Sequence, residues 1–260
     1  MRKFAACVWL AAMVWAAAGL ASDIGVIILM GKGGTNGEKS PIAPVIQALE
    51  NAGYLVEAPE APWARARYLA RDYEESMAEI DQAVDKLKAR GAWRIVVGGQ
   101  SMGANAALGY GARRDGLAGI LALSPGHMVE SASQQKLFAE SLSRARAMVA
   151  AGKGGEVAEF QDNNNQAPFK ARMAARVYVD WFDPNGPSLF PRNAAALKAS
   201  TPLLWLQGDH DQNTKNYGKS YAFAKAPPHP KSAYVVVPGG HLDSAGTAAD
   251  KVVAWIQALD

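Results

Sequence analysis

Short apolar segments recur along this chain and are separated by longer segments with helical periodicity. Each apolar segment is rich in Val, Ile and Leu, carries few charges and meets Gly or Pro near its ends. Strands that are buried on both faces of a parallel sheet have this composition. We therefore predict strands at residues 24–30, 54–56, 93–97, 117–123, 202–206 and 233–237.

Amphipathic segments lie between the predicted strands. The clearest begins at Asp72, which can cap a helix, with Glu75 three residues later as in a capping box. Its apolar residues recur at helical spacing as far as Leu87, and Gly91 then ends it. Further helices are predicted at residues 42–51, 101–113 and 246–259. Because strands and helices alternate, we expect an α/β fold whose mostly parallel sheet has helices on both faces.

One segment, residues 128–200, interrupts the alternation because it is more polar and less regular than its surroundings. We expect a helix at residues 133–151, a loop at 152–167 and a second helix at 169–182. We interpret this segment as a cap inserted into a single domain that covers residues 22–260. A chain of 260 residues is compatible with one α/β domain.

The first 21 residues have a different character. Arg2 and Lys3 precede an uncharged and mostly apolar stretch, and small residues stand around Ala21. A secretory signal peptide has this order of features, whereas the apolar stretch is at the short limit for a membrane anchor. We expect cleavage after Ala21 and a periplasmic or secreted protein that keeps no integral membrane association.

Composition argues against several kinds of site. The chain has 27 basic and 24 acidic residues, and two of the basic ones lie in the predicted signal peptide. Such a balance gives no basic field for nucleic acid. The only cysteine, Cys7, also lies in that segment, so the mature protein would have no disulfide or thiolate ligand. No two of the four histidines have the spacing of a helical zinc motif, and we expect neither a metal nor another cofactor.

A Gly-x-Ser-x-Gly motif follows the predicted strand at 93–97, and it reads Gly99-Gln100-Ser101-Met102-Gly103. On a sharp strand-to-helix turn, the serine projects at a helix N-terminus, where partial positive charge favours a developing anion. The motif resembles the nucleophile elbow of the α/β-hydrolase superfamily, with Gln100 where many members carry His. The resemblance covers residues 24–260 and is closest to compact serine esterases and dienelactone-hydrolase-like members. It implies Ser101 as the nucleophile.

The same resemblance implies a base and an acid, because a serine hydroxyl is a poor nucleophile until a neighbouring base accepts its proton. In the superfamily the chain order is serine, acid and then histidine. His241 follows the last predicted strand, which is where the superfamily has its base. The acid should follow the strand at 202–206, where Asp211 matches the family spacing after Gly208 and Asp209 is a close competitor.

An oxyanion hole is also implied by the resemblance. One donor would be the backbone N–H of Met102, the residue after the nucleophile, and the other would come from the loop after the first strand. That Gly-rich loop begins at Met30 and resembles a His-Gly-x-x-Gly loop in which Met30 replaces the usual His. Lys32 would then supply the second N–H. Where measured, one such donor lowers the barrier by on the order of 3 kcal/mol.

Large apolar side chains are candidates for the lining of a substrate pocket, and these are Trp63, Tyr178, Trp181, Phe182 and Phe190. The simpler interpretation of each is that it packs the cap onto the sheet.

These features together predict a serine hydrolase that cleaves a carboxylic ester of a small-molecule acyl substrate through an acyl-enzyme on Ser101. The alternatives are an acyltransferase, a thioesterase or an amidase with the same triad, or a non-catalytic binding protein on the same fold. The sequence carries no signal for an oligomeric state.

Overall fold

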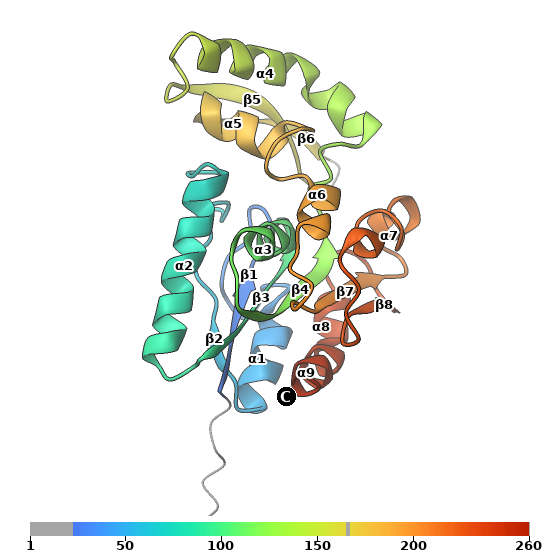
Figure 1. The fold of residues 1–260 in the computed structure, drawn as a ribbon. Coiled ribbons are helices and arrows are strands. Elements are labelled where there is room, and N and C mark those ends of the chain that lie inside the picture. The colour runs from blue at the N-terminus through green and yellow to red at the C-terminus, as the bar shows by residue number, and fades with distance from the viewer. Residues whose placement is uncertain (1–22, 165–166, 260) are drawn as a thin grey trace, which may run out of the picture.

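The computed structural model describes residues 23–164 and 167–259, which form a parallel sheet with helices on both faces (Figure 1). The order of the six strands is β2-β1-β3-β4-β7-β8, and every neighbouring pair is parallel. The strands are β1 (Ile24–Leu29), β2 (Leu55–Glu57), β3 (Arg94–Ser101), β4 (Leu117–Pro125), β7 (Leu203–Gly208) and β8 (Ala233–Val237). The predicted parallel sheet is confirmed, although β3 runs four residues further than expected and ends at Ser101.

Helices cover the sheet in two groups. They are α1 (Ala43–Asn51), α2 (Tyr73–Ala89), α3 (Met102–Arg113), α8 (Ser244–Thr247) and α9 (Ala249–Gln257). Helix α1 packs beside α9, and α2 packs beside α3. The predicted capping box is present, because the Asp72 side chain accepts from Glu75 N and the Glu75 side chain accepts from Asp72 N. The predicted helix at 246–259 is in fact two helices that meet at Ala248.

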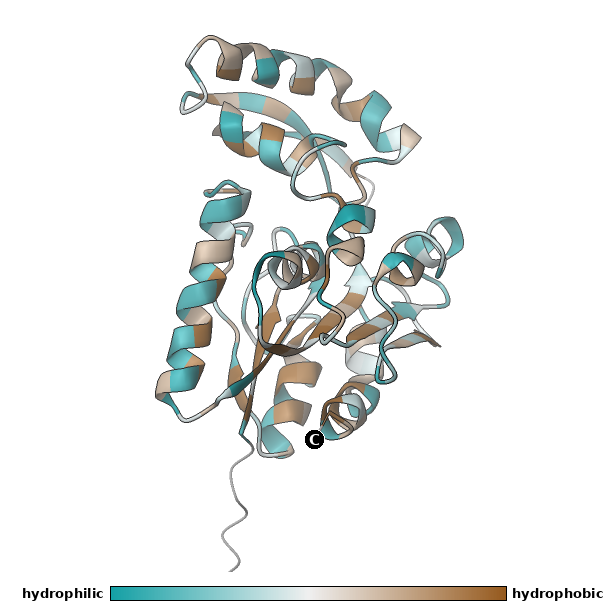
Figure 2. Cartoon of the chain, viewed as in Figure 1, coloured by the Kyte–Doolittle hydropathy of each residue, from teal (hydrophilic) through white to brown (hydrophobic). Residues whose placement is uncertain are grey.

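The hydrophobic core lies between the sheet and these helices. Figure 2 shows hydrophobic strands in the interior and mixed helices whose outer surfaces are more hydrophilic. All six residues of β1 are buried, as expected for a central strand that is covered on both faces. At about 25 cal/mol per Å² of apolar surface removed from water, such strands are a main source of stability.

The segment between β4 and β7 folds beyond the carboxyl ends of the strands (Figure 1). It contains α4 (Ala132–Ala150), β5 (Val157–Asn164), β6 (Ala167–Ala174), α5 (Ala175–Phe182) and α6 (Phe190–Ala195). We call residues 128–200 the cap. Helix α4 lies within a residue of the helix expected there. The loop predicted at 152–167 and the start of the helix predicted at 169–182 are wrong, because β5 and β6 form an antiparallel hairpin.

The physical reason is a period-two pattern that polar residues conceal. Along the hairpin, Phe160, Asp162, Ala171 and Met173 are buried, and residues between them are more exposed. One buried position in this alternation is a carboxylate rather than an apolar side chain. The strand pattern was therefore not visible as alternating hydrophobicity.

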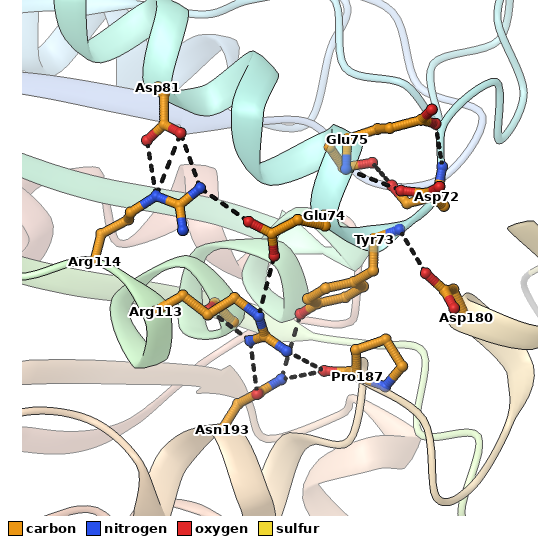
Figure 3. Close-up of polar contacts among 12 residues, drawn as sticks. Asp72, Tyr73, Glu74, Glu75, Asp81, Arg113, Arg114, Asp180, Pro187 and Asn193 are labelled. Atoms are coloured by element: carbon orange, nitrogen blue, oxygen red, sulfur yellow. Dashed lines mark hydrogen bonds and ion pairs between the residues drawn. The ribbon is translucent and has the colours of Figure 1, made fainter.

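Polar contacts hold the part of the cap that contains α5 and α6 on the body of the protein (Figure 3). Tyr73 N at the start of α2 donates to Asp180 Oδ2 of α5 at 3.2 Å. Asn193 of α6 donates through Nδ2 to Pro187 O at 2.9 Å and accepts from Arg113 Nη1 of α3 at 3.1 Å. Because Tyr73 and Asn193 are buried, these hydrogen bonds satisfy groups that would otherwise be costly to bury.

Within the two described ranges, no helix combines the length and the apolar character that crossing a bilayer would require. The predicted signal peptide at residues 1–21 lies outside the described residues.

Candidate active site

The Gly-x-Ser-x-Gly motif forms a tight turn between β3 and α3. Ser101 ends the strand and precedes the helix, with φ 58° and ψ −118°. A non-glycine residue in such a conformation typically costs about 1–3 kcal/mol and is found where a site over-determines the backbone. A Cβ added to Gly103 would lie 2.3 Å from Leu29 O, so only glycine lets the first turn of α3 meet the end of β1.

The structure brings together the three side chains that the sequence suggested. His241 Nε2 lies 2.9 Å from Ser101 Oγ, and His241 Nδ1 lies 2.8 Å from Asp211 Oδ2. Asp211 is 2% exposed, and its Oδ1 accepts from Asn213 N at the start of α7 (Gln212–Asn216). An ionised Asp211 favours a proton on Nδ1, which leaves the Nε2 lone pair to accept the serine proton.

Asp209, the competing acid, is placed differently. Its side chain is 47% exposed and lies beside His210, at 2.9 Å between Oδ1 and Nδ1. The same oxygen accepts from Gly239 N at 3.0 Å. Asp209 therefore supports the loop before His241, and the geometry favours Asp211 as the carboxylate that orients the imidazole.

The loop from Gly31 to Thr35 lies against the nucleophile, since a Cβ added to Gly31 would be 3.1 Å from Ser101 Cβ. Gly34 N donates to Gly31 O at 3.0 Å. The Gly31 C=O and the Lys32 N–H belong to the same trans peptide and point in opposite directions, so this bond turns the Lys32 N–H away from Gly34. No acceptor for the Lys32 N–H is found among the residues that the structure describes. The Met102 N–H belongs to the first turn of α3, where no intrahelical acceptor exists.

Two side chains, Trp63 and Gln100, support the loops around Ser101 in ways that the sequence did not reveal. Trp63, expected in the pocket, donates instead from Nε1 to Met30 O at 2.7 Å, and its carbonyl accepts from Gly33 N at 2.8 Å. Gln100 is buried and donates from Nε2 to His241 O at 2.9 Å. Gln100 thus ties the elbow to the histidine loop. A polar residue at the buried end of a strand is the sequence signal that could have suggested this contact.

A cavity of about 1080 Å³ opens beside Ser101 and His241. Its lining comes from the loop at residues 31–35, which we call the oxyanion loop after the role expected of it, and from the beginning of α4, the tip of the hairpin and α7. Apolar lining residues include Met128, Val129, Leu137 and Phe138, and polar ones include Gln134, Asn163, Asn164, Asn213 and Asn216. The cavity therefore offers both apolar contact and uncharged hydrogen-bonding groups next to the serine.

None of the aromatic residues proposed as pocket lining contributes to this cavity, so that prediction is wrong. They are buried in packing contacts. Tyr178 stacks on Phe182 with ring centroids 4.3 Å apart, Trp181 meets Trp63 edge-on at 5.5 Å, and Phe190 meets Trp205 at 5.8 Å. Aromatic side chains bury the most area when they pack together, and here they join the cap to the body.

His127 also lines the cavity but has a different environment from His241. Its Nε2 lies 2.8 Å from Trp181 O, and its backbone has a positive φ of 70°. Burial, together with the nearby charge of Lys32, lowers the pKa of His127 to about 3. The ring is therefore neutral near pH 7 and bound to the cap, and it is not poised to accept a proton from Ser101.

Replacing Gly126 by alanine should disable the serine without unfolding the protein. Gly126 follows β4, and an added Cβ would lie 2.5 Å from Ser101 Oγ and 3.3 Å from His241 Cε1. Displacing these atoms by about 1 Å can cost on the order of 100-fold in rate. We expect fluorophosphonate labelling of Ser101 to slow by about that factor. Gly218→Ala, where an added Cβ meets nothing within 4 Å, is the control. Unchanged labelling of Gly126→Ala would contradict the arrangement described here.

Comparison with known proteins places this geometry in context. A family model described as Serine aminopeptidase, S33 matches residues 34–242. No match is found among the curated proteins.

Several solved structures are similar in fold. A monoacylglycerol lipase of Paleococcus ferrophilus is 20% identical, with a TM-score of 0.65 over 91% of this chain and 95% of the other. A thermostable carboxyl esterase of Bacillus coagulans is 15% identical, with a TM-score of 0.61 over 90% of each chain. A structure from work on the metagenome-derived lipolytic enzymes LipS and LipT is 16% identical, with a TM-score of 0.63 over 92% of this chain and 95% of the other. These likenesses confirm the α/β-hydrolase fold.

Proposed function

Because the chain belongs to the serine aminopeptidase S33 family of α/β-hydrolases, we propose that it is a serine hydrolase that cleaves a carboxylic ester through an acyl-enzyme on Ser101. The observation that carries the proposal is the hydrogen-bonded series Ser101–His241–Asp211, at 2.9 and 2.8 Å, beside an open cavity. A serine hydroxyl bound in this way to a histidine that a buried carboxylate orients is the usual arrangement for acyl transfer.

In the first half of the reaction, Ser101 Oγ attacks the ester carbonyl while His241 Nε2 accepts the hydroxyl proton. Asp211 stabilises the imidazolium, and the N–H groups of Lys32 and Met102 stabilise the oxyanion. The tetrahedral intermediate collapses as the C–O bond to the alcohol breaks, and the imidazolium gives its proton to the leaving oxygen. The alcohol departs and the acyl group stays on Ser101.

In the second half, His241 takes a proton from a water molecule as its oxygen attacks the acyl carbonyl. The new tetrahedral intermediate collapses, the bond between the carbonyl carbon and Ser101 Oγ breaks, and the imidazolium returns the proton to Oγ. The carboxylic acid leaves and the serine is regenerated. The same groups serve both halves, so the site needs no additional acid or base.

The cavity supports an uncharged ester in preference to a peptide with a free amino terminus. Such an amine would require an unpaired carboxylate. Of the two carboxylates in the lining, Asp211 pairs with His241, and Asp243 is exposed to solvent and accepts from Gly240 N at 2.8 Å, so neither is a buried, dedicated partner for an ammonium group. Similar solved structures are named as lipases and esterases, which is consistent with an ester substrate.

A substrate panel tests this proposal. The purified protein is assayed with p-nitrophenyl esters of increasing acyl length and, in parallel, with aminoacyl p-nitroanilides, and is labelled with a fluorophosphonate probe. We expect ester turnover and probe on Ser101. Turnover of the anilides alone would replace the esterase by an aminopeptidase. Absence of turnover and of labelling would remove the hydrolase proposal and favour a binding role.

Export of the protein is also part of the proposal. It rests on the charged, apolar and small-residue order of the first 21 residues. N-terminal sequencing of the protein recovered outside the cytoplasm tests it, and Ser22 is the expected first residue. A chain that keeps Met1 and stays with the cytoplasmic fraction would contradict export.

A further inference from the structure

Asp162 is a buried carboxylate in the cap, far from the triad in sequence. It lies near the end of β5 and is 0% exposed. A buried carboxylate is costly unless it is paired and hydrogen-bonded. The burial of Asp162 must therefore be explained by the groups that pair with its carboxylate.

Those partners connect the cap to the body next to the oxyanion loop. Lys32 Nζ donates to Asp162 Oδ1 at 2.5 Å, and Tyr68 OH donates to Asp162 Oδ2 at 2.7 Å. The Lys32 side chain is only 7% exposed, so the ion pair is shielded from solvent on both sides. Asn163 N also donates to the Asp162 carboxylate, at 2.6 Å. All of these donors converge on one carboxylate.

The hairpin holds Lys32 at a second and a third point. Lys32 Nζ also donates to Asn163 O at 2.8 Å, and Asn164 Nδ2 donates to Lys32 O at 3.2 Å. The peptide that follows Lys32 is held at its other end too, because Gly33 N donates to Trp63 O at 2.8 Å. The side chain and the carbonyl of Lys32 are thus fixed, while its N–H has no acceptor among the described residues.

From this arrangement we infer that Asp162 is a positioning residue, which acts through Lys32 to hold the oxyanion loop in its working geometry. The inference rests on the proposed function, because it assumes that the Lys32 N–H stabilises an oxyanion. The pair also neutralises the ammonium of Lys32, a residue that lines the cavity together with Ser101. A rate effect should follow, because the strength of an oxyanion hole depends on donors that are already in place.

Asp162→Asn tests the inference. The amide keeps the shape but loses the charge that holds Lys32, so the loop should shift. We expect kcat for p-nitrophenyl esters to fall about 10- to 100-fold, since a displacement near 1 Å can cost 100-fold, while KM changes less than about threefold. The rate of fluorophosphonate labelling should fall with kcat, because phosphonylation uses the same donors.

Two controls separate positioning from docking of the cap. Glu159→Gln makes the same chemical change at an exposed position of the same strand. Asp180→Asn weakens a different contact between cap and body, the one to Tyr73 N, which does not touch the oxyanion loop. Both controls should keep kcat within about twofold of the parent, because neither moves the Lys32 N–H. An equal fall of kcat in Asp180→Asn would overturn the inference in favour of a general docking role.

A second variant covers the case in which Asp162→Asn does not fold. Tyr68→Phe removes one hydrogen bond to Asp162 and leaves the ion pair, and kcat should fall by a smaller factor of about 3 to 10. Unchanged kcat in Tyr68→Phe, and in Asp162→Asn where that variant folds, would refute the positioning role alone if the parent is active. A parent that neither turns over esters nor labels on Ser101 would refute the proposed function instead.

Discussion

Replacing Ser101 by alanine should lower kcat/KM for ester hydrolysis by on the order of 10⁵- to 10⁶-fold, as loss of the nucleophile does in enzymes with a catalytic triad. The reason is chemical, because without Oγ no acyl-enzyme forms and only binding and the oxyanion donors remain. The residual rate is measured with the best p-nitrophenyl ester from the panel, and intact-protein mass spectrometry monitors fluorophosphonate labelling.

The fold should survive this change. Alanine adopts the positive φ of residue 101 at a strain similar to that of serine, and the removed oxygen lies at an open cavity. We expect the free energy of unfolding to change by less than about 1 kcal/mol, within the range of substitutions that leave the core intact. Ser133→Ala, at another serine that lines the cavity, is the matched control and should keep most of the activity. A Ser101→Ala protein with more than about 1% of the parent rate would mean that another group is the nucleophile.

Local sequence features specified the elbow and the sheet. Gly99 and Gly103 are required because the elbow packs closely on itself and on the end of β1, where an added Cβ would lie 2.5 Å from Gly103 C and 2.3 Å from Leu29 O, respectively. Both glycines stand in one short motif, so the motif is enough to recognise the elbow. The proposed partners of Ser101, Asp211 and His241, could be suggested because chemistry in a parallel sheet gathers at the carboxyl ends of strands. Each partner lies in the loop after a strand that its apolar composition reveals.

The cap could not be read in the same way. Its hairpin carries Asp162 at a buried strand position, and the reason for that residue is Lys32, which lies 130 positions away in the chain. Contacts of this range leave no periodic trace in one sequence. A lysine inside a Gly-rich loop against the nucleophile was nevertheless a clue, because a cation in such a place needs a counter-charge.

The aromatic residues of the cap were misplaced for a related reason. Composition indicates which side chains will be buried but not whether they face a cavity or each other. In the structure Trp181 contacts Trp63 and Tyr73 across the boundary between cap and body. The cavity wall is formed instead by the amides of the hairpin tip and α7 and by the apolar start of α4.

The acid of the proposed triad is the assignment for which the sequence offered two candidates, and a pair of asparagine variants can decide between them. Asp211→Asn should lower kcat by on the order of 10⁴-fold, as the corresponding change does in a serine protease triad. The amide can donate to His241 Nδ1 and thereby favour the tautomer whose Nε2 carries a proton and cannot accept one from Ser101. It also carries no charge to stabilise the imidazolium. Steady-state kinetics with one ester measures the effect.

Asp209→Asn is the matched comparison, because it makes the same change two residues away in the same loop. Asp209 is half exposed and accepts from Gly239 N, a contact that asparagine can also make through its amide oxygen, so kcat should stay within about threefold. Asparagine at 211 can still cap α7, as aspartate does through Oδ1, so both variants should unfold like the parent. The order of the two effects identifies the acid. A large loss in Asp209→Asn with a small loss in Asp211→Asn would transfer the role to Asp209 and would require the loop before His241 to rearrange during the reaction.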